Sequence, residues 1–295
     1  MQTPAAEVDL DESLVERLIQ AQHPDLADRA LSLVTNGWDN AIYRLTGGLG
    51  GDLCVRLPRR KVAVELVVNE QRWLPRLAAN VTVPIPVPVR TGVPEFGYPW
   101  PWTITRWYEG TIAAALPMSR RAAIAGQLGE FMAGWHRPAP DDAPRSPVRG
   151  IPLPQRDPGV RQGLASGLVP NADALGRLWD RVVATPPWTD RSVWLHGDPH
   201  PANFLITDDE SLVVLDFGDL GAGDPATDLA AGWLVFDADA REAFRRAVNP
   251  DEHTWARALG WALALGIAFQ QHCDDNPMMA AIATHTLREV SRYTV

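Results

Sequence analysis

Two carboxylates and one amide stand at the points of this sequence where chemistry is most readily expected: Asp198, Asn203 and Asp216. Residues 212–215 form a continuous apolar run between polar turns, which predicts a buried strand, and 204–206 is its expected hairpin partner. Such a hairpin would bring Asn203 near Asp216, with Asp198 on the loop just before it. Carboxylate and amide oxygens suit Mg²⁺, which commonly shares its coordination with substrate phosphates. The pattern therefore predicts phosphoryl transfer.

The motif H-G-D-P-H-P-A-N at 196–203, followed by D-F-G at 216–218, resembles the catalytic loop and the metal loop of the aminoglycoside phosphotransferases. These are protein-kinase-like kinases of antibiotics and other small molecules. The resemblance implies an α+β, two-lobed fold, with an antiparallel-sheet N-lobe that carries one main helix and a mostly helical C-lobe. It also implies a nucleotide-binding lobe at 1–107 and a catalytic and substrate-binding lobe at 108–295.

The resemblance assigns a role to each polar residue of this stretch. Asp198 would be the catalytic base that accepts the proton of a substrate hydroxyl, while Asn203 and Asp216 would hold Mg²⁺. ATP or GTP would be the phosphate donor. Asp228 resembles the buried aspartate that braces the catalytic loop in this family, so we expect a structural role for it. We expect His196 to orient the loop rather than to exchange protons.

Arg56 departs from the family pattern, because it stands where the family has a phosphate-binding lysine on the third strand, here expected at 53–57. Arginine keeps the charge and can bind phosphate through two hydrogen bonds, but its longer, planar group makes the exchange not automatically conservative. Glu70, on an expected helix at 62–79, resembles the glutamate that pairs with this cation. The alternative is that Glu70 is a solvated helix residue, and Glu65 is the nearest other candidate for pairing with Arg56.

Two more segments resemble nucleotide-binding parts of the family. The loop from Gly37 to Asn40 resembles the short flap over the nucleotide phosphates, although a plain hairpin turn would look the same. The expected strand at 102–108 resembles the segment that joins the two kinase lobes. By this resemblance the Arg106 carbonyl and the Tyr108 amide would bind the base.

The remaining patterns predict mainly helices. Residues 83–89 alternate proline with apolar residues and predict an edge strand. The proline-rich segment 138–158 predicts a loop or an open flap. The expected helices lie at 10–22, 119–136 with Ser119 as N-cap, around Trp179, and at 230–236, 240–248, 254–273 and 278–293.

Charge and composition limit the classes of partner. Residues 196–295 contain sixteen acidic residues against six arginines, whereas the whole chain has a formal net charge of −9. This acidic second half argues against nucleic acid and is compatible with a cationic small molecule, although solubility alone would give the same pattern. No apolar run approaches the ~20 residues that span a bilayer, the acidic N-terminus has no signal-peptide pattern, and Cys54 and Cys273 form no metal spacing. We therefore expect a cytoplasmic enzyme without a membrane partner.

The most specific hypothesis is a small-molecule O-phosphotransferase whose acceptor is an aminoglycoside or another antibiotic. Kinases of an amino alcohol or a sugar remain open, and Trp233 or Trp261 are candidate flat contact surfaces for a ligand. A nucleotide-binding pseudokinase is a further alternative, motivated by Arg56. A metal-dependent hydrolase built on His196, Asp198 and His200 is the last.

Overall fold

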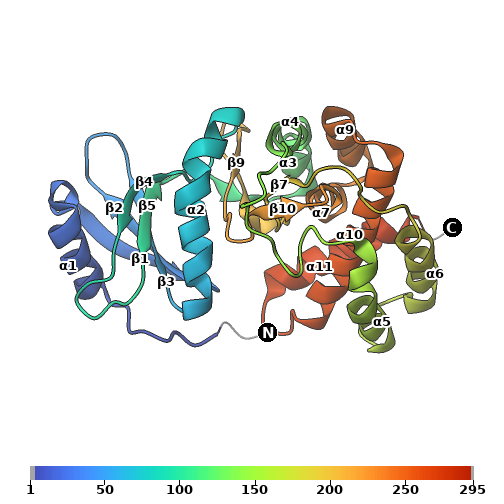
Figure 1. Cartoon of the computed structure of the whole chain (residues 1–295), viewed down its shortest axis with the longest axis horizontal. Coiled ribbons are helices and arrows are strands. Elements are labelled where there is room, and N and C mark those ends of the chain that lie inside the picture. The colour runs from blue at the N-terminus through green and yellow to red at the C-terminus, as the bar shows by residue number, and fades with distance from the viewer. Residues whose placement is uncertain (1–3, 294–295) are drawn as a thin grey trace. The chain divides into compact units, whose positions relative to one another are not determined.

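The computed structural model describes residues 4–293, which form two compact units: an N-terminal unit of 4–79 and 84–109, and a C-terminal unit of 80–83 and 110–293 (Figure 1). The functional boundary expected between 107 and 108 stays a prediction. The helices and strands of the N-terminal unit are α1 (Glu12–Gln22), β1 (Ala30–Asn36), β2 (Asn40–Thr46), β3 (Leu53–Pro58), α2 (Val64–Leu77), β4 (Pro88–Gly92) and β5 (Trp102–Arg106).

The N-terminal unit is an antiparallel sheet with one helix on each face (Figure 1). Its strand order is β1-β2-β3-β5-β4. On one face, Val15, Leu18 and Ile19 of α1 pack into an apolar core with residues of β2, β3 and β5. On the other face lies α2, whose Gln71 Nε2 donates to the Trp102 carbonyl at 2.9 Å. Because side chains alternate along a strand, the sheet presents apolar residues to α1 and a different set to α2.

Two predictions for this unit were wrong in their bounds. The edge strand expected at 83–89 begins only at Pro88 and runs to Gly92, although it does lie at the edge of the sheet. The prolines before it lack a backbone N–H and so supply no donors for pairing. The strand expected at 102–108 ends at Arg106.

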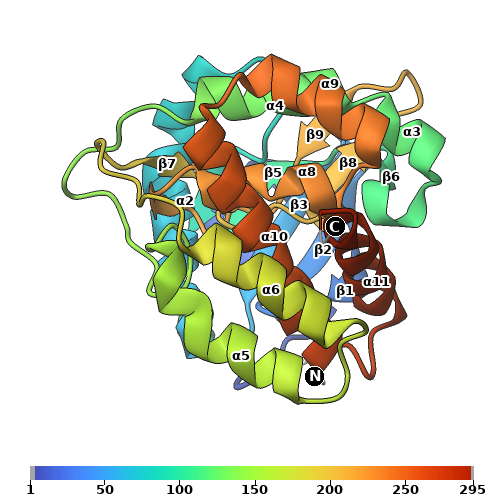
Figure 2. The same ribbon diagram turned by 90° about the vertical axis from the view of Figure 1, so that its right-hand side faces the viewer.

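The C-terminal unit is mostly helical and is built around α10, which lies beside α5, α6 and α11 (Figure 2) and also contacts α7. Asp251 caps α10 by accepting from the Thr254 N–H at 2.9 Å. The elements of the unit are β6 (Thr111–Ile112), α3 (Met118–Ala122), α4 (Ala125–Trp135), α5 (Asp157–Ala165), α6 (Ala172–Val183), β7 (Val193–Leu195), β8 (Phe204–Ile206), β9 (Leu212–Val214), β10 (Gly221–Gly223), α7 (Ala226–Leu229), α8 (Ala231–Leu234), α9 (Ala238–Val248), α10 (Glu252–Gln271) and α11 (Pro277–Ser291).

Short strands position the polar residues of this unit. β8 pairs with β9 in the expected antiparallel hairpin, with Phe204 opposite Val214, and β6 extends this sheet beside β8. β7 pairs with β10. All the residues of β7 to β10 are buried, so the loops that leave these strands start from a well-packed base.

Two of the expected helices differ from the prediction. The helix expected at 119–136 breaks at Ile124, which is fully buried and whose backbone (φ −94°, ψ 4°) leaves the helical region. Ser119 lies inside α3, and Pro117 holds the N-cap position instead. The helix expected at 230–236 corresponds to α8 alone, which ends at Leu234, and the short α7 precedes it. The α+β class is confirmed, with an antiparallel sheet in the N-terminal unit and mostly helices in the C-terminal unit.

Candidate active site

The loop 196–203 begins directly after β7 and is held by the buried carboxylate of Asp228. Asp228 Oδ2 accepts from the His196 backbone N–H at 2.7 Å, and Oδ1 accepts from the Gly197 N–H at 2.8 Å. Nε2 of His136, the residue that follows α4, lies 3.1 Å from the same Oδ2. Asp228 is fully buried, so all its polar contacts serve the protein itself. Its expected role as a structural brace is confirmed.

Two further residues fix the path of this loop. Gly197 has φ +89°, and a Cβ at this position would lie 2.3 Å from the Asp219 carbonyl oxygen, so only glycine is accommodated. The His196 ring joins the two motifs, because Nε2 bonds to the Leu215 carbonyl at 2.8 Å and Nδ1 accepts from the Asp198 N–H at 3.2 Å. His196 therefore orients the loop, as expected.

The carboxylate of Asp198 is held unevenly. Its Oδ2 lies 3.0 Å from both His200 Nε2 and Asn203 Nδ2. Its Oδ1 has an Arg149 guanidinium nitrogen at 3.6 Å, which is longer than a hydrogen bond. The Ala202 N–H lies 3.2 Å from His200 Nδ1, so Nε2 is the ring nitrogen whose hydrogen points at Asp198.

The electrostatics of this group keep Asp198 ionised. Burial raises the pKa of the Asp198 carboxyl, but the charge and hydrogen bond of His200 and the charge of Arg149 outweigh it, so this pKa lies well below its ordinary value. Burial lowers the pKa of His200, yet the charge and hydrogen bond of Asp198 outweigh that effect and raise it. An ionised carboxylate can accept a proton from a hydroxyl group, which is what a general base requires.

The two expected metal ligands lie at the start and the end of the β8–β9 hairpin. The Leu215 N–H donates to the Asn203 carbonyl at 2.8 Å, which ties Asp216 to Asn203 through its neighbour. Asn203 Nδ2 is used by Asp198, so Oδ1 is the atom assigned to a cation. Asp216 is exposed and has a left-handed backbone, with φ 55°. This donor set of oxygens fits Mg²⁺; the metal role of the two residues stays a prediction.

The hydrolase alternative does not fit this geometry. Both ring nitrogens of His196 and both of His200 already have protein partners. Within residues 4–293, no group of three or more His, Cys, Asp or Glu side chains is placed to hold a metal ion. The histidines of this motif orient the loop and Asp198 instead.

In the N-terminal unit, Arg56 and Glu70 form a buried ion pair with two hydrogen bonds, at 2.8 Å and 3.2 Å. The pairing expected from the sequence is confirmed, and it excludes a solvated glutamate. Val55 and Leu57 belong to the core that α1 covers, so Arg56, on the opposite face of β3, meets α2. The nucleotide-binding role of Arg56 and Glu70 stays a prediction.

The loop from Gly37 to Asn40 is a tight turn between β1 and β2. The Gly37 N–H donates to the Asn40 carbonyl at 2.9 Å, and Arg59 donates to the Gly37 carbonyl at 2.7 Å. Asn40 Oδ1 is buried without a hydrogen-bond partner in the described chain. The flap role of Gly37 and Asn40 stays a prediction, but the Gly37 amide is already used within the turn.

The segment after β5 has a defined backbone direction. The Trp107 N–H donates to the Asp52 carbonyl at 3.0 Å. Since the polar groups of alternate residues in an extended chain point the same way, the Arg106 carbonyl and the Tyr108 amide are expected on the side away from Asp52. The Tyr108 hydroxyl donates to the Ile85 carbonyl at 2.9 Å, which fixes this residue. Base binding by Arg106 and Tyr108 stays a prediction.

A family model described as the APH phosphotransferase enzyme family matches residues 30–261, which is most of the chain. The chain belongs to this family. The resemblance identified from the two motifs and the expected class of enzyme, an aminoglycoside-phosphotransferase-like phosphotransferase, are thereby confirmed.

Solved structures with the same fold include several antibiotic phosphotransferases. A GDP complex of aminoglycoside 2'-phosphotransferase-IIIa is 19% identical, with a TM-score of 0.68 over 96% of this chain and 99% of that chain. The macrolide 2'-phosphotransferase MphH from Brachybacterium faecium is 22% identical, with a TM-score of 0.63 over 92% and 96%. A spectinomycin phosphotransferase in complex with ADP and spectinomycin is 12% identical, with a TM-score of 0.66 over 97% and 99%. The comparison with curated proteins found no match. The expected kinase-like two-lobed fold is confirmed.

Sequence reasoning missed two side chains at the candidate site of this phosphotransferase. Arg149, in the proline-rich segment, lies 3.6 Å from both Asp198 and Asp219. His200 was considered only as a metal ligand. Its place two residues after Asp198 was a usable signal, whereas an arginine before a glycine in a loop gives almost none.

One prediction about ligand contacts was wrong. Trp233 and Trp261 are fully buried in the helical core, so neither offers a surface to a ligand. Trp233 packs against Trp255 with ring centroids 4.6 Å apart. Their apolar rings contribute to stability instead.

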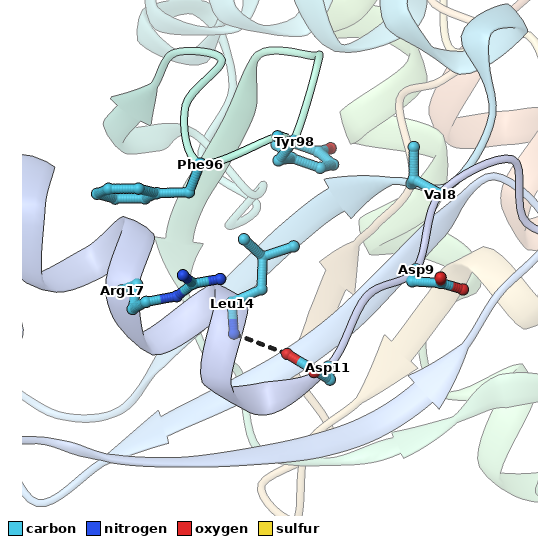
Figure 3. A pocket seen from close by; sticks show the side chains of 8 residues that line it. Val8, Asp9, Asp11, Leu14, Arg17, Phe96 and Tyr98 are labelled. Atoms are coloured by element: carbon cyan, nitrogen blue, oxygen red, sulfur yellow. Dashed lines mark hydrogen bonds between the residues drawn. The ribbon is translucent and has the colours of Figure 1, made fainter.

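A surface pocket of about 400 Å³ lies on the N-terminal unit, at the start of α1 and the β4–β5 connection (Figure 3). The Asp11 carboxylate in it caps α1 through the Leu14 N–H at 2.7 Å. Arg17 lies over the Phe96 ring, 5.5 Å from its centroid. None of the expected site residues lines this pocket, so it has no part in the candidate site.

One finding concerns membranes. Within residues 4–293, no helix is both long enough and apolar enough to cross a bilayer.

Proposed function

We propose that this chain transfers the γ-phosphate of ATP or GTP to a hydroxyl group of a small molecule, and that the acceptor is an aminoglycoside or another antibiotic. The proposal depends chiefly on one observation: an ionised Asp198 whose Oδ2 is held by His200 and Asn203, on the loop that follows the family's pattern. Related structures with GDP, or with ADP and spectinomycin, support a nucleotide donor and a hydroxyl-bearing antibiotic.

In this reaction Asp198 accepts the proton of the acceptor hydroxyl. The hydroxyl oxygen forms a bond to the γ-phosphorus, and the bond between that phosphorus and the β–γ bridging oxygen breaks, with its electrons leaving on the nucleoside diphosphate. Asn203 and Asp216 would hold Mg²⁺, which neutralises phosphate charge when bound. Orientation of the acceptor and charge stabilisation supply most of the rate.

In the N-terminal unit, Arg56 would bind the nucleotide phosphates while Glu70 fixes its guanidinium. The flap from Gly37 to Asn40 would cover the phosphates, and Arg106 and Tyr108 would bind the base. The two hydrogen bonds to Glu70 orient the Arg56 guanidinium, and its planar, permanently charged group suits the recognition of phosphate. Cytoplasmic localisation belongs to the same proposal.

The test is a screen of the purified protein with ATP or GTP and Mg²⁺. The acceptor panel should include aminoglycosides, macrolides, spectinomycin, amino alcohols and sugars, with product identified by mass spectrometry. We expect a phosphorylated antibiotic and no product when Mg²⁺ is chelated. Metal-dependent nucleotide binding without a phosphorylated product across the panel would refute the proposal and favour a pseudokinase.

A further inference from the structure

The two oxygens of Asp198 have different surroundings, and this difference identifies the one that faces the acceptor. His200 and Asn203 both approach Oδ2 at 3.0 Å. The Arg149 guanidinium approaches Oδ1 at 3.6 Å, beyond hydrogen-bond distance. Oδ1 is therefore the oxygen at which a substrate hydroxyl can be accommodated, next to the guanidinium.

Arg149 is presented by a backbone that is fixed on both sides. Its own N–H donates to Ser146 Oγ at 3.1 Å. The next residue, Gly150, donates to Thr227 Oγ1 at 3.0 Å and accepts from the Asp224 N–H at 3.0 Å. Gly150 has φ +64°, a conformation that favours glycine. These contacts hold the base of the side chain in a defined place.

The Arg149 guanidinium lies between two carboxylates and is not saturated by either. Its Nε is 3.6 Å from Asp219 Oδ2, and this buried Nε has no hydrogen-bond partner among residues 4–293. Like charges on Asp198 and Asp219 repel each other strongly in a partly buried site. A cation between them removes that repulsion.

We propose that Arg149 is a positioning residue for phosphoryl transfer, which holds Oδ1 of Asp198 at the acceptor hydroxyl by separating it from Asp219. The proposal rests on the function proposed above. His200 and Asn203 fix Oδ2, and Arg149 fixes the rotation of the carboxylate about that anchor. Without the guanidinium, Oδ1 turns away from the Asp219 charge and from the acceptor.

The first experiment compares Arg149→Gln with Arg149→Lys and with a matched control, Arg145→Gln. Arg145 lies in the same loop, is exposed, and bonds Ser192 Oγ at 3.3 Å. Misplacement of a reacting group by about 1 Å can cost ~100-fold in rate, so we expect Arg149→Gln to lower kcat by about 10- to 100-fold while leaving KM for the nucleotide unchanged. Arg149→Lys keeps the charge and should lose less, and the control should match wild type.

The second experiment adds Asp219→Asn to Arg149→Gln. If Arg149 acts by offsetting Asp219, removal of that charge restores part of the lost kcat, so that the double variant is faster than Arg149→Gln alone. A double variant that is no faster than Arg149→Gln overturns the proposal, as does an Arg149→Gln enzyme with wild-type kcat.

A crystal structure of Arg149→Gln beside that of the wild type gives a readout that needs no acceptor. We expect the Asp198 carboxylate to rotate, with Oδ2 still near His200 and Oδ1 displaced away from Asp219. An unmoved carboxylate overturns the proposal. Absence of transfer by the wild-type chain would instead refute the proposed function, so the two failures are distinguishable.

Discussion

The two units each place an arginine beside carboxylates, but in opposite ways. In the N-terminal unit, Arg56 forms two hydrogen bonds with Glu70, and both side chains are buried. In the C-terminal unit, Arg149 stands between Asp198 and Asp219 at 3.6 Å from each, with an unpartnered Nε. We call the first arrangement closed, because its charged groups are hydrogen-bonded to each other. We call the second open, because its guanidinium lies beyond hydrogen-bond distance of both carboxylates.

The difference separates stability from catalysis. A closed, buried pair leaves an uncompensated charge when one partner is removed, which is costly for folding. An open arrangement makes few short bonds within the protein, so its removal costs little stability, while its charge acts on the group that it faces. We therefore expect changes at the closed pair to lower stability and changes at the open arrangement to lower turnover.

The largest effect on kcat is expected when Asp198, the proposed base of the open arrangement, is replaced. Asp198→Asn should lower kcat by about 10²–10⁴, because an amide cannot accept the proton of the acceptor hydroxyl. Nucleotide binding should be retained, and the melting temperature should change little. Steady-state kinetics, nucleotide titration and thermal unfolding test the three statements; a variant with more than about half the wild-type turnover would contradict the assignment.

Breaking the closed pair gives the next effect. Arg56→Ala should lower the free energy of unfolding by about 3–5 kcal/mol, since the buried Glu70 would lose the guanidinium that compensates its charge. The same variant should raise KM for ATP. Arg56→Lys should be milder in both respects, although a lysine cannot form both of the hydrogen bonds that Arg56 makes.

Denaturant unfolding measures the change in the free energy of unfolding, and steady-state kinetics measure the change in KM for ATP. The double variant Arg56→Met with Glu70→Leu is the control, because it removes both charges together and should regain much of the stability without regaining nucleotide affinity. Wild-type KM for ATP in a folded Arg56→Ala protein would remove Arg56 from the nucleotide site.

The closed pair could be predicted from sequence, and the open arrangement could not. Arg56 lies in a short apolar run bounded by turns, so its strand, its face and its distance in sequence from Glu70 follow from periodicity. The motifs around Asp198 and Asp216 identify themselves by residue type and spacing. Residues held by regular elements or by dense motifs are therefore the predictable ones.

Arg149 lies neither in a regular element nor in a recognisable motif. Its segment is rich in proline and lacks periodicity, and the residue reaches Asp198 only because Gly150 is bonded to Thr227 and Asp224. Contacts between residues so far apart in sequence depend on tertiary packing. The break in the helix expected at 119–136 has the same origin, because the buried Ile124 leaves the helical region although its local pattern is helical.

The next prediction concerns Asp216, the expected Mg²⁺ ligand in the C-terminal unit. Asp216→Ala should weaken Mg²⁺-dependent nucleotide binding by on the order of 100-fold, since even residues that only support a metal ligand affect affinity by about 10- to 100-fold. Stability should hardly change, because this side chain is exposed. Titration of nucleotide binding with Mg²⁺ measures the effect, with Asp209→Ala on the exposed β8–β9 turn as the control. Unchanged titration curves would exclude Asp216 as a ligand.

The smallest expected effect concerns a closed arrangement inside the C-terminal unit. His285 Nε2 lies 3.2 Å from the Phe236 carbonyl, and Arg288 lies 3.0 Å from Nδ1. Both ring nitrogens of the neutral histidine are thus satisfied. Burial, together with the charges of Arg121 and Arg288, outweighs Glu289 and lowers the pKa of His285 to about 4. If closed arrangements act on stability in both units, replacing His285 should change the free energy of unfolding and leave kcat unchanged.

The sign follows from which state binds the proton. An unfolded histidine has a pKa of about 6.5, so between this value and about 4 the unfolded chain takes up a proton that folded His285 refuses. Stability from this group is complete above pH 6.5 and falls with pH, by about 2 kcal/mol at pH 5. His285→Gln can donate to Phe236 and accept from Arg288 without titrating, so its unfolding free energy should fall less between pH 7 and pH 5 than that of the wild type. Equal slopes for the two proteins would show that His285 is protonated in the folded state and that its closed arrangement carries no pH dependence.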